Sequence, residues 1–200
     1  MITPGEEKAW EILAGLDPSL VCKNASVTFE EQRHSYIVRS FCYDYSVSTK
    51  ERIISSDSPQ GESLAGRYPY FFLHSCLWYL IHAKDIAETN RLVRPGDIKG
   101  GELFFRGSHV LPLNTLAERY AENGQAFLNR GEHLCADPAD YGDVSIRLRP
   151  MPRIPATLVL WLGDDEFPSR AALLFDSSCG LQVPIDIVWS MAMLTVLAAL

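Results

Sequence analysis

Cysteine is scarce in this sequence, and no two cysteines lie close together. The chain has 200 residues and five cysteines, and the nearest two, Cys22 and Cys42, are twenty positions apart. An iron–sulfur cluster or a structural zinc site usually draws on at least one close pair, and a disulfide scaffold needs a denser, even set. We therefore expect buried, chemically inert thiols and no cysteine-ligated cluster. These thiols are Cys22, Cys42, Cys76, Cys135 and Cys179.

Basic residues are also few, and long apolar runs are missing. The 18 Lys and Arg against 25 Asp and Glu give a net charge of −7, which argues against a general affinity for nucleic acid phosphates. The most apolar stretch, residues 187–200, has fourteen residues, whereas a membrane-spanning helix needs about 20. We expect neither a nucleic-acid partner nor a membrane partner, and we expect residues 187–200 to lie in a buried helix.

A secretion signal is lacking as well. Met1–Glu7 is acidic and has no apolar core, unlike a signal peptide, so a cytoplasmic location with reduced thiols is expected. Thr3 and Glu6 have the spacing of a helix capping box, which predicts a helix with Trp10 and Leu13 on its inner face. The composition is globular, with 47% apolar and 22% charged residues, and the length suits one domain over residues 1–200.

Alternation of apolar and polar residues predicts four short strands near the N-terminus. They are expected at Val27–Phe29, Tyr36–Ser40, Tyr43–Val47 and Arg52–Ser55. The short gaps between them favour an antiparallel meander. A loop is expected over Ser55–Gly66 because that segment is rich in Ser, Gly, Pro and Asp.

The remaining chain predicts helices around a central hairpin. A strand is expected from Val144 until Pro150 breaks it. Two apolar runs, Ala156–Leu162 and Ala171–Phe175, are expected to pair as a hairpin buried on both faces. Helices are expected at Tyr70–Ala83, Thr115–Arg130 and Pro184–Leu200, the second with Thr115 and Glu118 as a capping box. The fold class is therefore α+β, with an antiparallel sheet covered by helices.

A polar run ends the apolar segment Glu102–Phe105. Arg106, Ser108 and His109 follow it with a glycine between them, on what we expect to be a loop before a helix. Arginine offers a rigid planar fork for a carboxylate or a phosphate. The sequence predicts Arg106, Ser108 and His109 as binding residues for an anionic small molecule, the alternative being a loop that ties itself to the sheet.

Three adjacent carboxylates follow the apolar run that ends at Leu162. Asp164, Asp165 and Glu166 repel one another unless they are solvated or coordinated, and oxygen ligands of this kind suit a divalent cation such as Mg²⁺ or Ca²⁺. Their spacing is not that of an EF-hand loop, and a solvated hairpin turn explains them as well. The two hypotheses are a metal site formed by these residues and an exposed turn.

Two other sets of polar residues have structural explanations. Arg147 and Arg149 alternate along a strand and so share one face, where they either bind an anion or pair with nearby acids. His74 and His82 lie on one predicted helix, about 12 Å apart along its axis. That separation is too large for one metal ion, which favours histidines satisfied in the core or at the surface.

Parts of the sequence resemble a known family. The segments Gly100–Pro112, Pro152–Pro168 and Leu174–Asp176 are similar to those of an uncharacterised domain-of-unknown-function family found mainly in anaerobic bacteria and archaea, and the clearest matches are Phe105–His109 and Trp161–Phe167. The resemblance extends over nearly the whole chain. Some family members are joined to a cysteine-rich iron–sulfur domain that this sequence does not contain. The resemblance implies an anaerobic setting and an iron–sulfur protein as a partner, and it implies no mechanism.

Three functions fit these residues. The first is a small-ligand or cofactor-binding domain in which Arg106 and His109 hold an anionic group. The second is a metal-assisted hydrolase or transferase, with His109 as acid or base and a cation on the carboxylates; it requires the Arg106 loop and the acidic turn to meet in one cleft. The third is a protein-interaction module without a catalytic site, which requires an exposed apolar patch instead.

Overall fold

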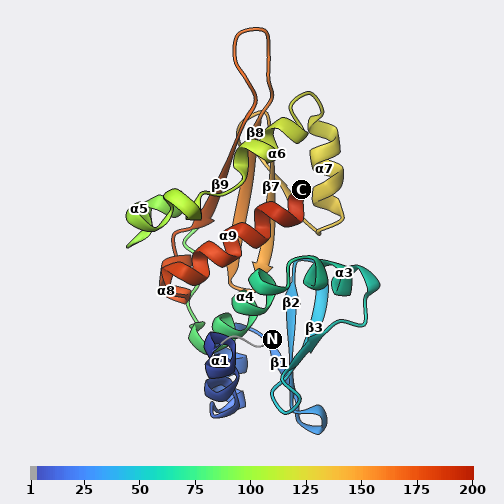
Figure 1. The fold of residues 1–200 in the computed structure, drawn as a ribbon, viewed down its shortest axis with the longest axis vertical. Helices are drawn as coiled ribbons and strands as arrows, with labels where there is room; N and C mark the ends of the chain where they lie inside the picture. Colours follow the sequence, from blue (N-terminus) through green and yellow to red (C-terminus); the bar gives the residue numbers. More distant parts are fainter. Residues whose placement is uncertain (1–3) are drawn as a thin grey trace.

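Two short helices begin the structure. The computed structural model describes residues 4–200, in which α1 (Pro4–Ala14) and α2 (Pro18–Ala25) precede the first sheet (Figure 1). The expected N-cap of the first helix, Thr3, lies outside the described residues. Trp10 and Leu13 are buried, as predicted. The side chain of Asp17 accepts the N–H of Ser19 at 2.8 Å and so begins α2.

A four-stranded antiparallel meander follows, as the alternation of polar and apolar residues predicts. Its strands pair in sequence order. They are β1 (Thr28–Glu30), β2 (Ser35–Ser40), β3 (Tyr43–Ser48) and β4 (Ile53–Ser55), with a 3₁₀ turn at Glu31–Arg33 between the first two. Tyr36 and Val38 of β2 pair with Val47 and Tyr45 of β3, and all four side chains are buried on the side of the helices.

The loop predicted over Ser55–Gly66 is wrong, because most of this segment forms helix α3 (Pro59–Arg67). The Ser58 hydroxyl accepts the N–H of Gly61 at 3.3 Å, and Pro59 occupies the first turn, where it costs no hydrogen bond. The polar composition of residues 55–66 therefore did not reveal the helix, whose N-cap is Ser58. Helix α4 (Pro69–His82) comes next, close to the predicted bounds.

The second sheet is antiparallel and has the strand order β5-β9-β8-β7-β6. Its strands are β5 (Leu92–Val93), β6 (Asp137–Ala139), β7 (Val144–Met151), β8 (Ile154–Trp161) and β9 (Arg170–Asp176). The predicted hairpin is β8–β9, and β8 is central and buried along almost its whole length. Pro150 does not end β7. The pairing of β7 with β8 is irregular between Leu148 and Met151, and Pro150, which has no N–H to donate, lies within this irregular stretch. The two shortest strands, β5 and β6, are absent from the sequence prediction.

Helices cover one face of this sheet (Figure 1). They are α6 (Leu113–Arg119), α7 (Gly124–Glu132), α8 (Cys179–Gln182) and α9 (Ile185–Ala199). The single helix predicted over Thr115–Arg130 is wrong: α6 begins after Pro112, and the Asn123 side chain accepts the N–H of Ala126 to start a separate α7. Helix α9 crosses the sheet, packs on α4 and is buried, as predicted. Among residues 4–200, no helix has the length and apolarity to cross a membrane.

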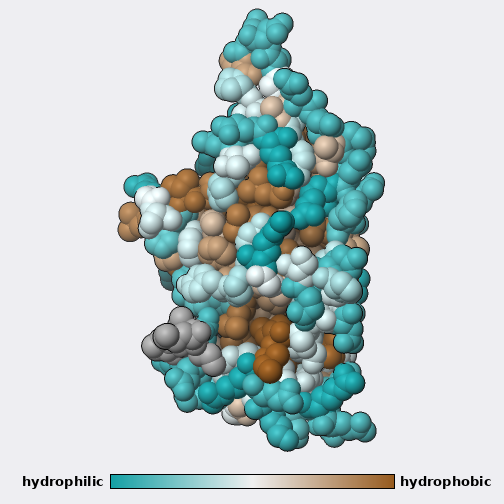
Figure 2. Space-filling view, turned by 45° about the vertical axis from the view of Figure 1, so that its right-hand side comes forward, coloured by the Kyte–Doolittle hydropathy of each residue, from teal (hydrophilic) through white to brown (hydrophobic). Residues whose placement is uncertain are grey.

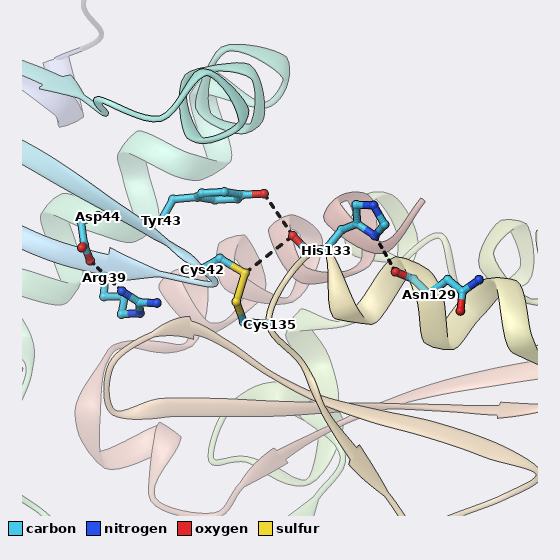
Figure 3. Close-up of a disulfide and its surroundings, with 7 residues drawn as sticks. All are labelled: Arg39, Cys42, Tyr43, Asp44, Asn129, His133 and Cys135. Atoms are coloured by element: carbon cyan, nitrogen blue, oxygen red, sulfur yellow. Dashed lines mark hydrogen bonds and ion pairs between the residues drawn. A yellow bond between two sulfur atoms is a disulfide. The ribbon is translucent and has the colours of Figure 1, made fainter.

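The two sheets meet at the turn between β2 and β3. The N–H of Phe41 donates to the Arg149 carbonyl at 2.8 Å, and the Ser40 hydroxyl donates to the Pro150 carbonyl at 2.8 Å. Beside these contacts, Cys42 forms a disulfide with Cys135, which follows α7 (Figure 3). The prediction of inert thiols is therefore wrong for this pair, since 93 residues of intervening chain fold back to bring them together.

The other three cysteines are free thiols. Cys76 and Cys179 are fully buried, and burial raises the pKa of each thiol to about 12. Such thiols are neutral and unreactive at physiological pH, as the sequence predicts for them.

Candidate functional site

Arg106 lies on the surface, just after the short helix α5 (Gly101–Phe104). The predicted polar run is a 3₁₀ turn (Gly107–His109), and the apolar residues before it form a helical turn. The Arg106 guanidinium pairs with the Glu102 carboxylate at 3.4 Å, and both side chains are largely exposed. Its charge is therefore shared with a carboxylate one turn earlier in the chain.

His109 is fixed by an aromatic cluster at the start of α9. Its ring centroid lies 4.5 Å from that of Phe104 and 4.8 Å from that of Trp189. The Trp189 indole N–H also donates to the His109 carbonyl at 3.0 Å. This contact ties the loop down, and the imidazole is half-buried among rings rather than set in a hollow.

The acidic turn stands at the end of the β8–β9 hairpin. Asp164 Oδ1 accepts the backbone N–H groups of Phe167 and Glu166 at 2.7 and 2.9 Å, and these bonds lower the pKa of the carboxyl. Within residues 4–200 no three His, Cys, Asp or Glu side chains are grouped so that they could hold a metal ion. The hairpin end is at the top of Figure 1 and α5 at its left, so the structure does not bring Asp164, Asp165 and Glu166 to the Arg106 loop.

A hollow of about 300 Å³ lies instead between α3, α7 and β3. Its walls carry Arg67, Arg130 and His133, and no Asp or Glu is among the described residues that line it. We call it the cationic pocket. Its remaining lining residues are Tyr43, Pro59, Gln60, Ser63, Leu64, Tyr68 and Leu134. The chain as a whole has a net charge of −7, so a pocket wall with two arginines differs from the rest of the surface and favours an anion.

The side chains of the two arginines and of His133 are held to different degrees. Arg130 donates from Nε and Nη2 to the Ala198 carbonyl, at 2.9 and 2.5 Å, which fixes the direction of its guanidinium. His133 Nδ1 lies 2.7 Å from the Asn129 carbonyl. A carbonyl only accepts, so Nδ1 carries the hydrogen and Nε2 is left for another partner. Arg67 is exposed at the end of α3, with no ion pair among the described residues.

Tyr43 lines the pocket next to His133, and the disulfide lies beside both residues. The Tyr43 hydroxyl donates to the His133 carbonyl at 3.0 Å, and Cys42 Sγ lies 3.6 Å from the same oxygen (Figure 3). These contacts hold the loop after α7 in the pocket wall. Sequence reasoning missed the pocket because Arg67 and Arg130 are 63 positions apart and share no motif. The one local signal was Ser58-Pro59, which marks the start of α3.

Arg147 and Arg149 share one face of β7, as predicted, and both pair with Glu88. Their charges are thus partly offset by a nearby acid. A second hollow of about 350 Å³ lies next to Arg147 and includes Asp176, which is 1% exposed. Burial by itself would raise the pKa of Asp176, but hydrogen bonds from Ser178 and Thr89 outweigh it and bring the pKa to about 2. Asp176 thereby ties the end of β9 to the segment before β5.

His74 and His82 belong to a ladder of rings along α4. Trp78 lies between them, and its ring centroid is 6.3 Å from that of His74 and 5.5 Å from that of His82. Burial lowers the pKa of both imidazoles, and the charge of Asp186 opposes this shift. Both histidines pack against aromatic rings, in agreement with the structural explanation.

Comparison with known proteins identifies the family of this chain. The profile of a family described as "Domain of unknown function (DUF3786)" matches residues 17–198. No curated protein and no solved structure matches the chain.

Proposed function

This chain belongs to the DUF3786 family of domains of unknown function, and we propose that it is a binding domain for a small anionic molecule, which it holds in the cationic pocket. The observation that carries the proposal is that Arg67, Arg130 and His133 line one hollow, with no carboxylate among the described residues of its wall. About 300 Å³ is the lower end of the range for small-molecule pockets, so the ligand is small.

The donors suit a carboxylate or a phosphate. A guanidinium presents parallel N–H groups that match two oxygens of either group. Arg130 is already oriented by its bonds to Ala198, so little ordering is left for the ligand to impose. His133 Nε2 donates a further hydrogen bond to the anion when the imidazole is protonated, because Nδ1 carries the hydrogen in the neutral form. Apolar surface from Leu64, Leu134 and the rings of Tyr43 and Tyr68 would face the rest of the molecule.

We place the ligand here rather than at the predicted residues Arg106, Ser108 and His109. Arg106 already pairs with Glu102, and the His109 ring packs in an aromatic cluster. An anion at that loop would have to compete with an ion pair and displace rings. The cytoplasm is kept as the proposed location, although the Cys42–Cys135 disulfide contradicts the expectation of reduced thiols there.

The test is a pair of matched arginine substitutions. Binding of inorganic phosphate and of a small dicarboxylate is measured by titration calorimetry for the wild type, Arg67→Gln and Arg106→Gln. A hydrogen bond to a charged group is worth about 1.5–3 kcal/mol, so Arg67→Gln is expected to weaken binding roughly tenfold or more. Arg106→Gln is expected to leave it unchanged. The reverse pattern would place the site in the predicted loop, and no binding by the wild type would reject the proposal.

A protein-interaction module is the second candidate, and one observation favours it. Leu103 and Val110 are 80% and 63% exposed on either side of the aromatic cluster. Figure 2 shows hydrophobic residues on the lobe at its left edge, at the height of α5 in Figure 1. If this patch binds a second copy of the chain, sedimentation velocity will show dimers that Leu103→Ser abolishes. A wild type that stays monomeric at all concentrations would reject this candidate.

A further inference from the structure

We propose that Cys42–Cys135 is a reversible thiol–disulfide site that reacts with a dithiol reductant, and that its reduction weakens anion binding in the adjacent pocket. The coupling to anion binding rests on the proposed function, whereas the redox site does not. The pair joins the turn between β2 and β3 to the loop that follows α7. It is therefore placed where a change of oxidation state alters a connection between the two sheets.

Exposure separates this pair from the buried cysteines. Cys135 is an exposed residue and Cys42 is half-buried, whereas Cys76 and Cys179 are completely buried. A thiolate from solution must approach one sulfur in line with the S–S bond, so access decides which disulfide exchanges. Exposed disulfides are the labile or regulatory ones more often than the structural ones. Cys135, as the more exposed partner, is the one we expect to be attacked.

The backbone on both sides of the bond is in an unusual conformation. Phe41 has a φ of 52° and Cys135 a φ of 50°. These values lie in the left-handed region, which residues other than glycine rarely adopt. Both residues lie in turns: Phe41 is in the turn between β2 and β3, and at the end of α7 the N–H groups of Cys135 and Ala136 donate to the carbonyls of Glu132 and Gly131 at 3.0 and 2.9 Å. Opening the disulfide removes the covalent constraint on Cys135 and leaves these two hydrogen bonds in place.

The loop that carries Cys135 also forms the pocket wall. His133 and Leu134 come immediately before Cys135 and both line the cationic pocket. Other contacts hold the loop as well: Leu134 is buried, and its N–H donates to the Gly131 carbonyl at 2.8 Å. The Tyr43 hydroxyl still holds the His133 carbonyl. Reduction is therefore expected to loosen His133 locally and to leave the fold intact.

The exchange balances with a dithiol as the named reductant. One thiolate of the dithiol attacks Cys135 Sγ, the S–S bond breaks, and Cys42 Sγ leaves with the electron pair and takes a proton. The second thiol of the reductant then attacks its own sulfur in the mixed disulfide and releases Cys135. The dithiol is oxidised to a disulfide, and two electrons and two protons end on Cys42 and Cys135.

The test uses the folded wild-type protein with dithiothreitol and a matched cysteine variant. Free thiols are counted after unfolding in denaturant without reductant, first on oxidised protein and then on protein that was reduced while folded. We expect three thiols per chain before reduction and five after it, with the five returning to three on reoxidation. Cys22→Ser, which removes a free thiol outside the pair, should show the same gain of two. No gain of two thiols while the protein stays folded would overturn the redox site.

Two further measurements connect the bond to the pocket. Hydrogen exchange of residues 131–136 is expected to become faster on reduction, and phosphate affinity is expected to fall about fivefold, as for the loss of one oriented hydrogen bond. The Cys42→Ser, Cys135→Ser double variant should match the reduced protein in both. Reversible reduction with equal affinity in both states would overturn the coupling. Reversible reduction with no phosphate binding in either state would overturn the proposed ligand and leave the redox site standing.

Discussion

Arg130 of α7 donates two hydrogen bonds to the carbonyl of Ala198, in the last turn of α9. A cation at this position also offsets the partial negative charge at the C-terminus of a helix. One side chain thus joins the buried helix to the cationic pocket. Its removal is expected to affect both stability and binding.

Arg130→Lys keeps the charge but loses the fork that bonds Ala198 from two nitrogens. The free energy of unfolding is expected to fall by about 1–2 kcal/mol, because a part-buried carbonyl loses its best donors. Urea denaturation measures this. The control is Arg106→Lys, whose exposed pair with Glu102 is worth about 0–1 kcal/mol. Equal stability of the two variants would show that the contact with Ala198 does not stabilise the fold.

The disulfide is expected to stabilise the protein substantially. Cys42 and Cys135 are 93 positions apart, and closing a loop of this size in the unfolded chain corresponds to roughly 4–5 kcal/mol in the chain-entropy description. Cys135→Ser should therefore lower the free energy of unfolding by about 2–5 kcal/mol under oxidising conditions. Cys22→Ser is the control. If the Cys135 variant is as stable as the wild type without reductant, the disulfide does not form in solution.

The last helix is expected to be indispensable. Leu194 is fully buried in α9, and Leu194→Ala should destabilise the protein by about 2–5 kcal/mol through the lost contacts and the cavity left behind. Deletion of residues 190–200 should cause aggregation or unfolding. Leu103→Ala, at an exposed position, is the control and should change the melting temperature little. A truncated chain that melts at the same temperature as the full chain would contradict the core role of α9.

Asp176 is expected to make stability depend on pH in the acid range. Its folded-state pKa is lowered to about 2, so its carboxylate stabilises the fold above the unfolded-state value near 4, and this contribution is lost as the pH falls toward 2. A shift of this size corresponds to roughly 2 kcal/mol.

The matched variant for this prediction is Asp176→Asn, which keeps an oxygen acceptor but cannot titrate. Unfolding free energies are measured in urea from pH 6 to pH 2 for both proteins. The loss between pH 4 and pH 2 should be smaller in Asp176→Asn than in the wild type. Parallel curves would mean that Asp176 does not carry the acid sensitivity.

Local pattern alone determined the secondary structure of several elements. The alternation around Tyr36 and Val38 predicted the meander, and the unbroken apolar sequence of residues 187–200 predicted a buried helix. Both follow from periodicity, because a strand turns successive side chains to opposite faces and a buried helix has no polar face. Boundaries that depend on single capping groups, at Ser58 and Asn123, were missed or misplaced.

Tertiary structure alone decided which distant residues meet. Cys42 and Cys135 are joined, and Arg67 and Arg130 face one hollow, because β3, α3 and α7 pack around the junction of the two sheets. Conversely, Arg106 and Asp164 both stood out in sequence as polar breaks in apolar runs, yet Arg106 follows α5 and Asp164 lies at the end of the β8–β9 hairpin. The sequence records neighbours along the chain, whereas a pocket is defined by distances that only the packed core sets.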